Sequence, residues 1–254
     1  MKIIFLVTVP LLMFLLQNCN AVDSNLDDSV RMVYGDDSKI SDSIKTLFNE
    51  DAARLALRDI QSNSSDKENL IIIPAYYVES YYYGLVHFYN ANYIPERDVV
   101  IDTYKIHTFR YPETHTLIVA VDSTKDWVQE WKNGNRLTGN QKVDELMETY
   151  NLQLYHYYSW PILQAAVLFS EEPLNIHALC NKFKPIDGVI YAESDGVIGD
   201  GNNITASIET NGIKYIFSYG WGDCPAGCIS RHYWEFKVKF DGIVQFINSY
   251  GDPL

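Results

Sequence analysis

The C-terminal residues 202–250 read NNITASIETNGIKYIFSYGWGDCPAGCISRHYWEFKVKFDGIVQFINSY, and this stretch decides the fold class. Apolar side chains occupy every second position over residues 204–208, 213–219 and 234–240. A period of two is typical of strands with one buried and one solvated face. The stretch therefore predicts four consecutive antiparallel strands, the last of them over residues 243–249.

Two turn signals separate these strands. Asn211-Gly212 is a dipeptide that suits both positive-φ positions of a two-residue hairpin, and we expect it to join the first two strands. Asp241-Gly242 is expected to form the turn before the last strand. Together they predict an antiparallel meander over residues 196–254.

Upstream of the meander, residues 99–195 show the order strand, helix, strand, strand, helix, strand. The first strand region is expected to be a hairpin of residues 105–109 and 116–121, turning at Tyr111-Pro112-Glu113. Helical patterns follow at 124–132, 141–150 and 173–183, and strand patterns at 152–160, 164–169 and 188–193. This order matches the split β-α-β arrangement of ferredoxin-like folds.

Residues 22–98 are expected to hold an acidic N-terminal segment and two helices. Asn49 is the expected N-cap of the first helix, because Glu50 and Asp51 would follow in its first turn. The polar residues 61–69 are expected to break that helix.

The second helix, over residues 74–91, concentrates tyrosines and is apolar around most of its circumference. Such a helix is normally buried, and an exposed platform for sugars is the alternative. With this helix the sequence predicts an α+β fold: N-terminal helices, a ferredoxin-like split β-α-β unit and a C-terminal four-stranded antiparallel meander.

Composition limits the function classes. The chain has 254 residues, 47% hydrophobic and 21% charged, so it can bury a core and is not intrinsically disordered. Its formal net charge is −13. Nucleic acids and anionic membranes attract basic patches, so we expect neither as the main partner.

Residues 1–21 have the features of a secretory signal peptide. Lys2 precedes an apolar run over residues 3–16, and Cys19-Asn20-Ala21 places small residues before a cleavage site. The run is shorter than the roughly 20 apolar residues of a transmembrane helix, so no transmembrane span is expected. The prediction is a secreted, extracellular protein, with a lipid anchor through Cys19 as the alternative.

Secretion affects two further kinds of residue. In a eukaryotic host Asn63 and Asn203 would be glycan acceptors, because each begins an Asn-x-Ser/Thr sequence. An oxidising compartment also favours a disulfide between Cys224 and Cys228, leaving Cys180 unpaired in the mature chain.

Two other roles are possible for the cysteines in residues 220–232, GWGDCPAGCISRH, if they do not form that disulfide. Cys224, Cys228 and His232 are soft ligands that could take part in a zinc site. A free cysteine thiolate could also act as a nucleophile with His232 as its base. The disulfide is our principal prediction, so we expect neither a metal nor another cofactor.

The stretch Gly-Trp-Gly-Asp-Cys-Pro-Ala-Gly-Cys-Ile-Ser-Arg-His-Tyr-Trp-Glu-Phe, residues 220–236, resembles a motif of uncharacterised secreted proteins, mainly bacterial. The resemblance extends upstream through Trp127, Trp131 and Asp144 and implies a self-contained unit without a known activity. Residues 179–193 are similar to the closing helix and strand of protease propeptide and inhibitor domains. That shorter likeness implies docking onto a subtilisin-like enzyme.

No catalytic motif is recognisable, since Gly-x-Ser-x-Gly, His-Glu-x-x-His, phosphate-loop and dinucleotide-binding patterns are absent. Our principal hypothesis is a non-catalytic binding or inhibitor-like protein whose partner is an extracellular protein or glycan. Because loops on rigid sheets commonly carry function, we expect contact through residues 220–234. The candidate contact side chains are Trp221, Asp223, Arg231, His232 and Tyr233.

Two other functions remain open. A zinc-stabilised module would use the ligands named above. A secreted hydrolase would need a carboxylate beside His232, or two carboxylates that converge only in three dimensions. Glu171 and Glu172 are adjacent, but the sequence cannot pair either with a carboxylate across a cleft.

Overall fold

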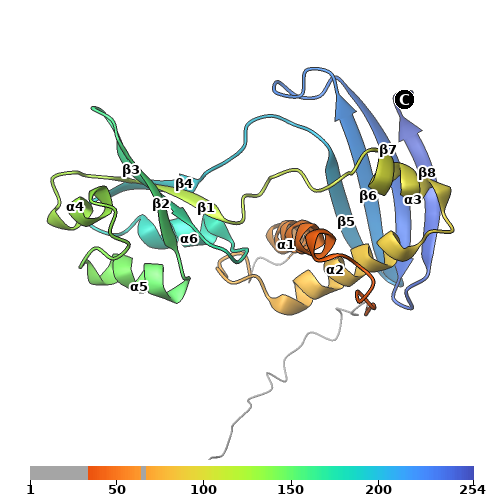
Figure 1. The fold of residues 1–254 in the computed structure, drawn as a ribbon, viewed down its shortest axis with the longest axis horizontal. Helices are drawn as coiled ribbons and strands as arrows, with labels where there is room; N and C mark the ends of the chain where they lie inside the picture. The colour runs from red at the N-terminus through yellow and green to blue at the C-terminus, as the bar shows by residue number, and fades with distance from the viewer. Residues whose placement is uncertain (1–33, 64–66) are drawn as a thin grey trace, which may run out of the picture. The chain divides into compact units, whose positions relative to one another are not determined.

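The computed structural model describes residues 34–63 and 67–254, so the expected signal peptide and Cys19 lie outside the described residues. The described chain forms two four-stranded antiparallel sheets with α-helices packed on them (Figure 1), which confirms the predicted α+β class. No helix within these residues is long and apolar enough to cross a bilayer.

The first sheet belongs to the ferredoxin-like unit. Its strand order is β2-β3-β1-β4, and every neighbouring pair is antiparallel. Two helices lie between β1 and β2 in the chain and one between β3 and β4, as the split β-α-β arrangement requires. The elements are β1 (Thr116–Val121), α4 (Asp126–Lys132), α5 (Gln141–Thr149), β2 (Gln153–Ser159), β3 (Gln164–Phe169), α6 (Ile176–Phe183) and β4 (Val189–Ser194).

All three helices of this unit pack on the same face of its sheet. Leu117, Val119 and Leu168 point into a core that also contains Trp131 of α4 and Phe183 of α6. Side chains alternate across a strand, so the residues between these point to the opposite face of the sheet. None of α4, α5 and α6 lies on that face.

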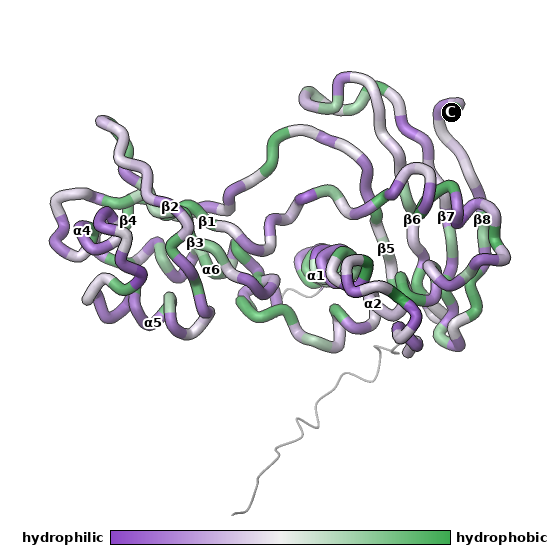
Figure 2. Tube along the Cα trace, viewed as in Figure 1, coloured by the Kyte–Doolittle hydropathy of each residue, from purple (hydrophilic) through white to green (hydrophobic). Residues whose placement is uncertain are grey.

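The second sheet is the predicted meander, with strands in chain order β5-β6-β7-β8. Figure 2 shows that its strands carry both hydrophobic and hydrophilic residues. Its strands and the N-terminal elements are β5 (Asn203–Glu209), β6 (Gly212–Trp221), β7 (Ser230–Lys239), β8 (Val244–Gly251), α1 (Asp42–Asn63), α2 (Ala75–Asn90), α3 (Pro95–Asp98) and the π-helix η1 (Val99–Thr103).

The tyrosine-rich helix α2 is buried against the meander, which confirms the core prediction for it. Tyr81 and Phe88 are 0% exposed. The ring of Phe88 lies 4.5 Å from that of Phe217 and 4.7 Å from that of Phe236, between centroids. The helices before the ferredoxin-like unit and the sheet after it therefore share one core, and the ferredoxin-like unit is inserted between the two parts.

The start of α1 differs from the prediction. The helix begins at Asp42, not after Asn49, and it continues to Asn63, into the expected polar break. Phe48 explains the earlier start, because it is 1% exposed and its ring packs 5.8 Å from that of Tyr89. Tertiary burial of this turn outweighs the local cap signal.

The expected hairpin before β1 was also wrong. Residues 105–109 form no strand; Asp51 of α1 binds them instead. One Asp51 oxygen accepts hydrogen bonds from the backbone N and the Oγ1 of Thr108, both 2.7 Å long. The other lies 2.7 Å from Nδ1 of His107. The backbone N–H of Thr108 is thus satisfied by α1, and that of Phe109 by Asn203 of β5, without a neighbouring strand.

The first turn of the meander lies one residue earlier than expected. Glu209 pairs with Gly212, so Thr210 and Asn211 form the turn, and neither Asn211 nor Gly212 has a positive φ. Gly212 is needed for another reason: a Cβ there would overlap the backbone oxygen of Val238 on β7. The second turn is as predicted, with Gly242 at a φ of 84°.

Candidate functional site

The predicted disulfide is present between Cys224 and Cys228. The bond occupies both sulfurs, so neither is free as a zinc ligand or a nucleophile. Cys180 lies in the core of the ferredoxin-like unit, where burial raises the pKa of its thiol to about 11. The structure therefore does not bring the cysteines together, and the described residues contain no cluster of three or more His, Cys, Asp or Glu suited to a metal.

The candidate contact residues of the loop lie on different surfaces. Trp221 stacks on Tyr219 of β6 at 5.5 Å, and His232 lies 4.6 Å from Trp234 of β7, so both are on the face that also packs against α2. Arg231 and Tyr233 alternate with these positions and point to the opposite face. Asp223 is in the loop itself and is exposed.

The side chain of Arg231 connects β7 to neighbouring segments of the chain. Its Nη2 lies 2.6 Å from Asp200 Oδ1, and its Nη1 donates to the backbone oxygen of Gly201 and to Oγ of Ser218, both at 2.8 Å. The side chain is only 17% exposed. Its charge holds the loop against the segment before β5, so contact through this loop stays a prediction that rests on Trp221 and Asp223.

His232 also has local partners. Its Nδ1 lies 2.7 Å from the backbone oxygen of Asp252, and its Nε2 lies 2.6 Å from Oγ of Ser249. A hydrolase using a carboxylate to orient His232 would place that carboxylate at one of these nitrogens. The ring instead ties the last residues of the chain to β7.

The two expected glycan acceptors differ in their surroundings. Asn63 lies at the exposed end of α1, with Nδ2 donating to Asp59 at 2.7 Å. Asn203 is half-buried, and its Oδ1 accepts from the backbone N of Phe109 at 2.9 Å and from Arg58 at 3.1 Å. Asn203 thus has a structural role in joining the start of β5 to the segment before β1.

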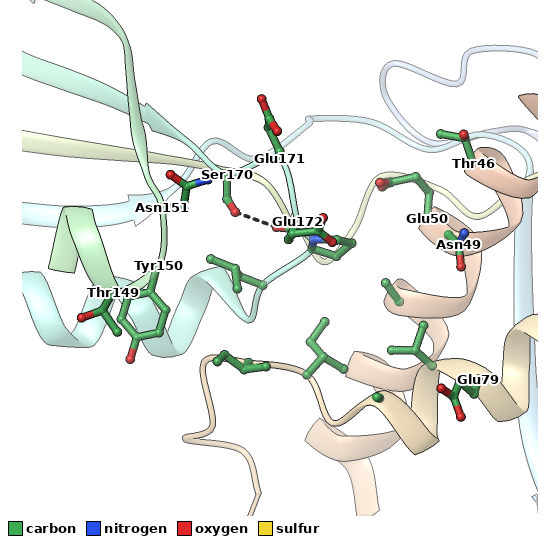
Figure 3. A pocket seen from close by; sticks show the side chains of 17 residues that line it. Thr46, Asn49, Glu50, Glu79, Thr149, Tyr150, Asn151, Ser170, Glu171 and Glu172 are labelled. Atoms are coloured by element: carbon green, nitrogen blue, oxygen red, sulfur yellow. Dashed lines mark hydrogen bonds between the residues drawn. The ribbon is translucent and has the colours of Figure 1, made fainter. Parts of the chain in front are cut away.

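A groove with a volume of about 730 Å³ lies where α1 and α2 meet the ferredoxin-like unit (Figure 3). Its walls come from four segments that are distant in the sequence. They are Thr46, Asn49, Glu50 and Ala53 of α1; Ile72, Ile73, Ala75, Val78 and Glu79 in and before α2; Thr149, Tyr150 and Asn151 at and after the end of α5; and Ser170, Glu171, Glu172, Pro173 and Leu174 after β3.

Hydrogen bonds to backbone groups hold the segments at the base of this groove together. Ile72 and Leu174 form an antiparallel bridge. The side chain of Asn175 donates to the backbone oxygens of Glu68 at 2.8 Å and of Leu70 at 3.1 Å. The segment before α2 and the loop after β3 are therefore fixed relative to each other at this point.

One wall of the groove contains a hydrogen-bonded ion pair. Glu50 Oε1 lies 2.7 Å from Nε2 of His115, whose Nδ1 lies 2.8 Å from the backbone oxygen of Ser170. Burial opposes ionisation of both groups. The mutual hydrogen bond and attraction outweigh it, so the pKa of Glu50 is lowered and the pKa of His115 is raised. Arg54 adds a second contact to Glu50 at 3.2 Å.

Three other carboxylates line the groove. Figure 3 shows Glu171 and Glu172 on the loop after β3 and Glu79 on α2, so acidic residues line the groove on both of its sides. Within the described residues, none of these three carboxylates has an ion pair or hydrogen bond from a side chain or backbone group. The floor between them is apolar, formed by Ala53, Ile73, Val78, Pro173 and Leu174.

The Glu50–His115 pair predicts a stability maximum in mildly acidic solution. The raised pKa of His115 gives stability that is complete below its ordinary value of 6.5 and lost as pH rises through the raised value. The lowered pKa of Glu50 gives stability that is complete above its ordinary 4.5 and lost as pH falls through the lowered value.

We therefore expect the unfolding free energy lost in His115→Gln to be largest between pH 4.5 and 6.5. It should shrink by about 1 kcal/mol toward alkaline pH, which is roughly the difference between a hydrogen bond to a charged group and one between neutral groups. Urea denaturation of both proteins across this range measures the difference. A loss that does not vary with pH would contradict the ion pair.

The groove was not predicted from the sequence, and the adjacent Glu171-Glu172 was its only visible sign. Comparison with known proteins adds no homologue, because no protein-family model, curated protein or solved structure matches the chain.

Proposed function

We propose that this protein is a secreted, non-catalytic binding protein that holds a cationic polypeptide segment in the groove. The main support for this proposal is that three carboxylates without a partner, those of Glu79, Glu171 and Glu172, surround an apolar floor. Lysine and arginine combine an apolar stem with a cationic end, so a segment containing them matches both parts of this surface.

The overall charge supports a basic partner. A formal net charge of −13 attracts cations over distances longer than a direct contact and raises the rate of encounter. The Cys224–Cys228 disulfide and the expected signal peptide support an extracellular location for this binding.

The chemistry of the groove favours binding over hydrolysis. A general acid must hold a proton near neutral pH, whereas the pKa of Glu50 is lowered by His115 and Arg54. His115 donates through one ring nitrogen to Glu50 and through the other to the Ser170 backbone oxygen, which leaves neither free for a substrate.

The test measures binding of a fluorescent decapeptide of alternating lysine and leucine by anisotropy. We expect the unmodified protein to bind it and the variant Glu79→Gln/Glu171→Gln/Glu172→Gln to bind at least about tenfold more weakly. Three partly exposed ion pairs at about 0.5 kcal/mol each add up to that loss. Binding should also weaken as salt concentration rises.

The matched control is Glu68→Gln/Glu145→Gln/Glu148→Gln, which removes the same charge from exposed positions outside the groove. It should bind the peptide nearly as well as the unmodified protein. Equal weakening in both triple variants would show attraction by net charge alone, and a peptide of alternating glutamate and leucine that binds as tightly would also refute the proposal.

A further inference from the structure

The uncovered face of the ferredoxin-like sheet carries a row of aromatic side chains. On the outward side of β2 and just beyond it, the rings of His156 and Tyr158 lie 4.4 Å apart. The rings of Tyr158 and Trp160 are stacked at 4.6 Å with an interplanar angle of 22°. Tyr155 and Trp160 are 77% and 50% exposed, although burial of aromatic rings is strongly favourable.

A hollow of about 550 Å³ lies beside this row. It is lined by Thr116, Ile118, Tyr155, Tyr158, Trp160, Val167, Phe169 and Asp195. That volume is within the range of roughly 300 to 1,000 Å³ typical of small-ligand sites. Protein interfaces instead extend over about 800 Å² on each partner and are usually flat, so the hollow favours a compact ligand.

The hollow also offers hydrogen-bonding groups that the protein does not use. The hydroxyls of Thr116, Tyr155 and Tyr158, the indole N–H of Trp160 and the carboxylate of Asp195 make no hydrogen bond to another part of the described chain. Donors and acceptors therefore stand at the edges of flat apolar rings.

We propose that this aromatic face, defined by Tyr155, Tyr158, Trp160, Thr116 and Asp195, binds a neutral oligosaccharide. A pyranose ring presents apolar C–H groups on its flat faces and hydroxyls around its edge. The ring faces of the aromatic row match the former, and the unused polar groups match the latter. The net charge of −13 disfavours an acidic saccharide.

A quaternary ammonium ion is the competing small ligand, because aromatic rings and a carboxylate also attract cations. A cation cage surrounds its ligand with rings on several sides. Tyr158 and Trp160 are instead stacked on each other, so they enclose no space for a cation between them and leave an outer ring face on which a sugar ring can lie. This site shares no residue with the groove, so the two proposals stand or fall independently.

Isothermal titration tests the proposal with soluble hexasaccharides of β-linked glucose, β-linked N-acetylglucosamine, β-linked xylose and α-linked mannose, and with tetramethylammonium. We expect at least one hexasaccharide to bind with a dissociation constant in the millimolar range or below. Trp160→Ala should weaken it about tenfold, whereas Trp160→Phe should retain most of the affinity because it keeps a ring for stacking.

The control is Tyr250→Ala, which removes a 42% exposed ring stacked on Tyr233 in the other sheet and should leave saccharide binding unchanged. If Trp160→Ala does not fold, Tyr155→Ala replaces it, since that side chain is mostly exposed. The proposal is overturned if no hexasaccharide binds, if only tetramethylammonium binds, or if removing these rings leaves the affinity unchanged.

Discussion

Asp51→Ala is expected to destabilise the protein by about 3 kcal/mol. The Asp51 carboxylate is 1% exposed and receives hydrogen bonds from the backbone and side chain of Thr108, with His107 at its other oxygen. Alanine would leave these donors without a partner inside the protein. Removing an acceptor from a buried donor costs more than the hydrogen bond itself contributes.

Denaturation in urea measures this loss of stability. Two further variants test whether the loss comes from the hydrogen bonds of Asp51. Asp51→Asn retains one acceptor oxygen and should lose roughly half as much. Asn49→Ala changes an exposed residue on the same helix and should be neutral or slightly stabilising, because alanine is the better helix former in a helix interior. A loss near 1 kcal/mol for Asn49→Ala would instead indicate a helix cap at that position.

Gly84→Ala is the second large effect, with an expected loss of about 2 kcal/mol. Helix propensity alone predicts the opposite sign, since alanine in a helix interior is favoured over glycine by about 1 kcal/mol. A Cβ on Gly84 would, however, overlap the hydroxyl oxygen of Tyr215, which is fully buried and donates to the backbone oxygen of Tyr81 at 3.0 Å. Packing therefore outweighs propensity here.

A double-mutant cycle isolates this contact. Tyr215→Phe removes the overlapping oxygen, so the loss in Gly84→Ala/Tyr215→Phe should be at least about 1 kcal/mol smaller than the sum of the single losses. Gly196→Ala is the control, because the nearest atom to a Cβ there is 3.9 Å away. Additive losses, or a stabilised Gly84→Ala, would mean that α2 shifts away from β6 without cost.

Local periodicity was sufficient to predict most of the elements. Alternation in the last fifty or so residues predicted all four strands of the meander, and the order of the strands and helices before it predicted the ferredoxin-like sheet. The errors involve long-range contacts. Asn49 is inside a helix because Phe48 is buried against α2, and residues 105–109 are not a strand because Asp51 binds them.

For the two candidate binding surfaces, too, the sequence pattern does not show which distant segments come together. The groove combines four segments, and nothing in the local pattern around Glu79 relates it to Glu172. The aromatic face had a clearer signal, because His156, Tyr158 and Trp160 alternate along the predicted strand. Alternation assigns these residues to one face, but only the tertiary structure reveals that no helix of this unit packs there.

The insertion of the ferredoxin-like unit has a consequence for synthesis on the ribosome. Its strands and helices are contiguous in the chain, so it has all its own partners as soon as β4 has been translated. Helices α1 and α2 are made earlier, yet Phe88 can be buried only after Phe217 and Phe236 have been translated. These two residues lie near the C-terminal end of the sequence and are among the last to emerge from the ribosome. Cotranslational folding therefore starts in the middle of the polypeptide, and the nascent N-terminal helices keep their tyrosine-rich surface open until elongation is almost complete.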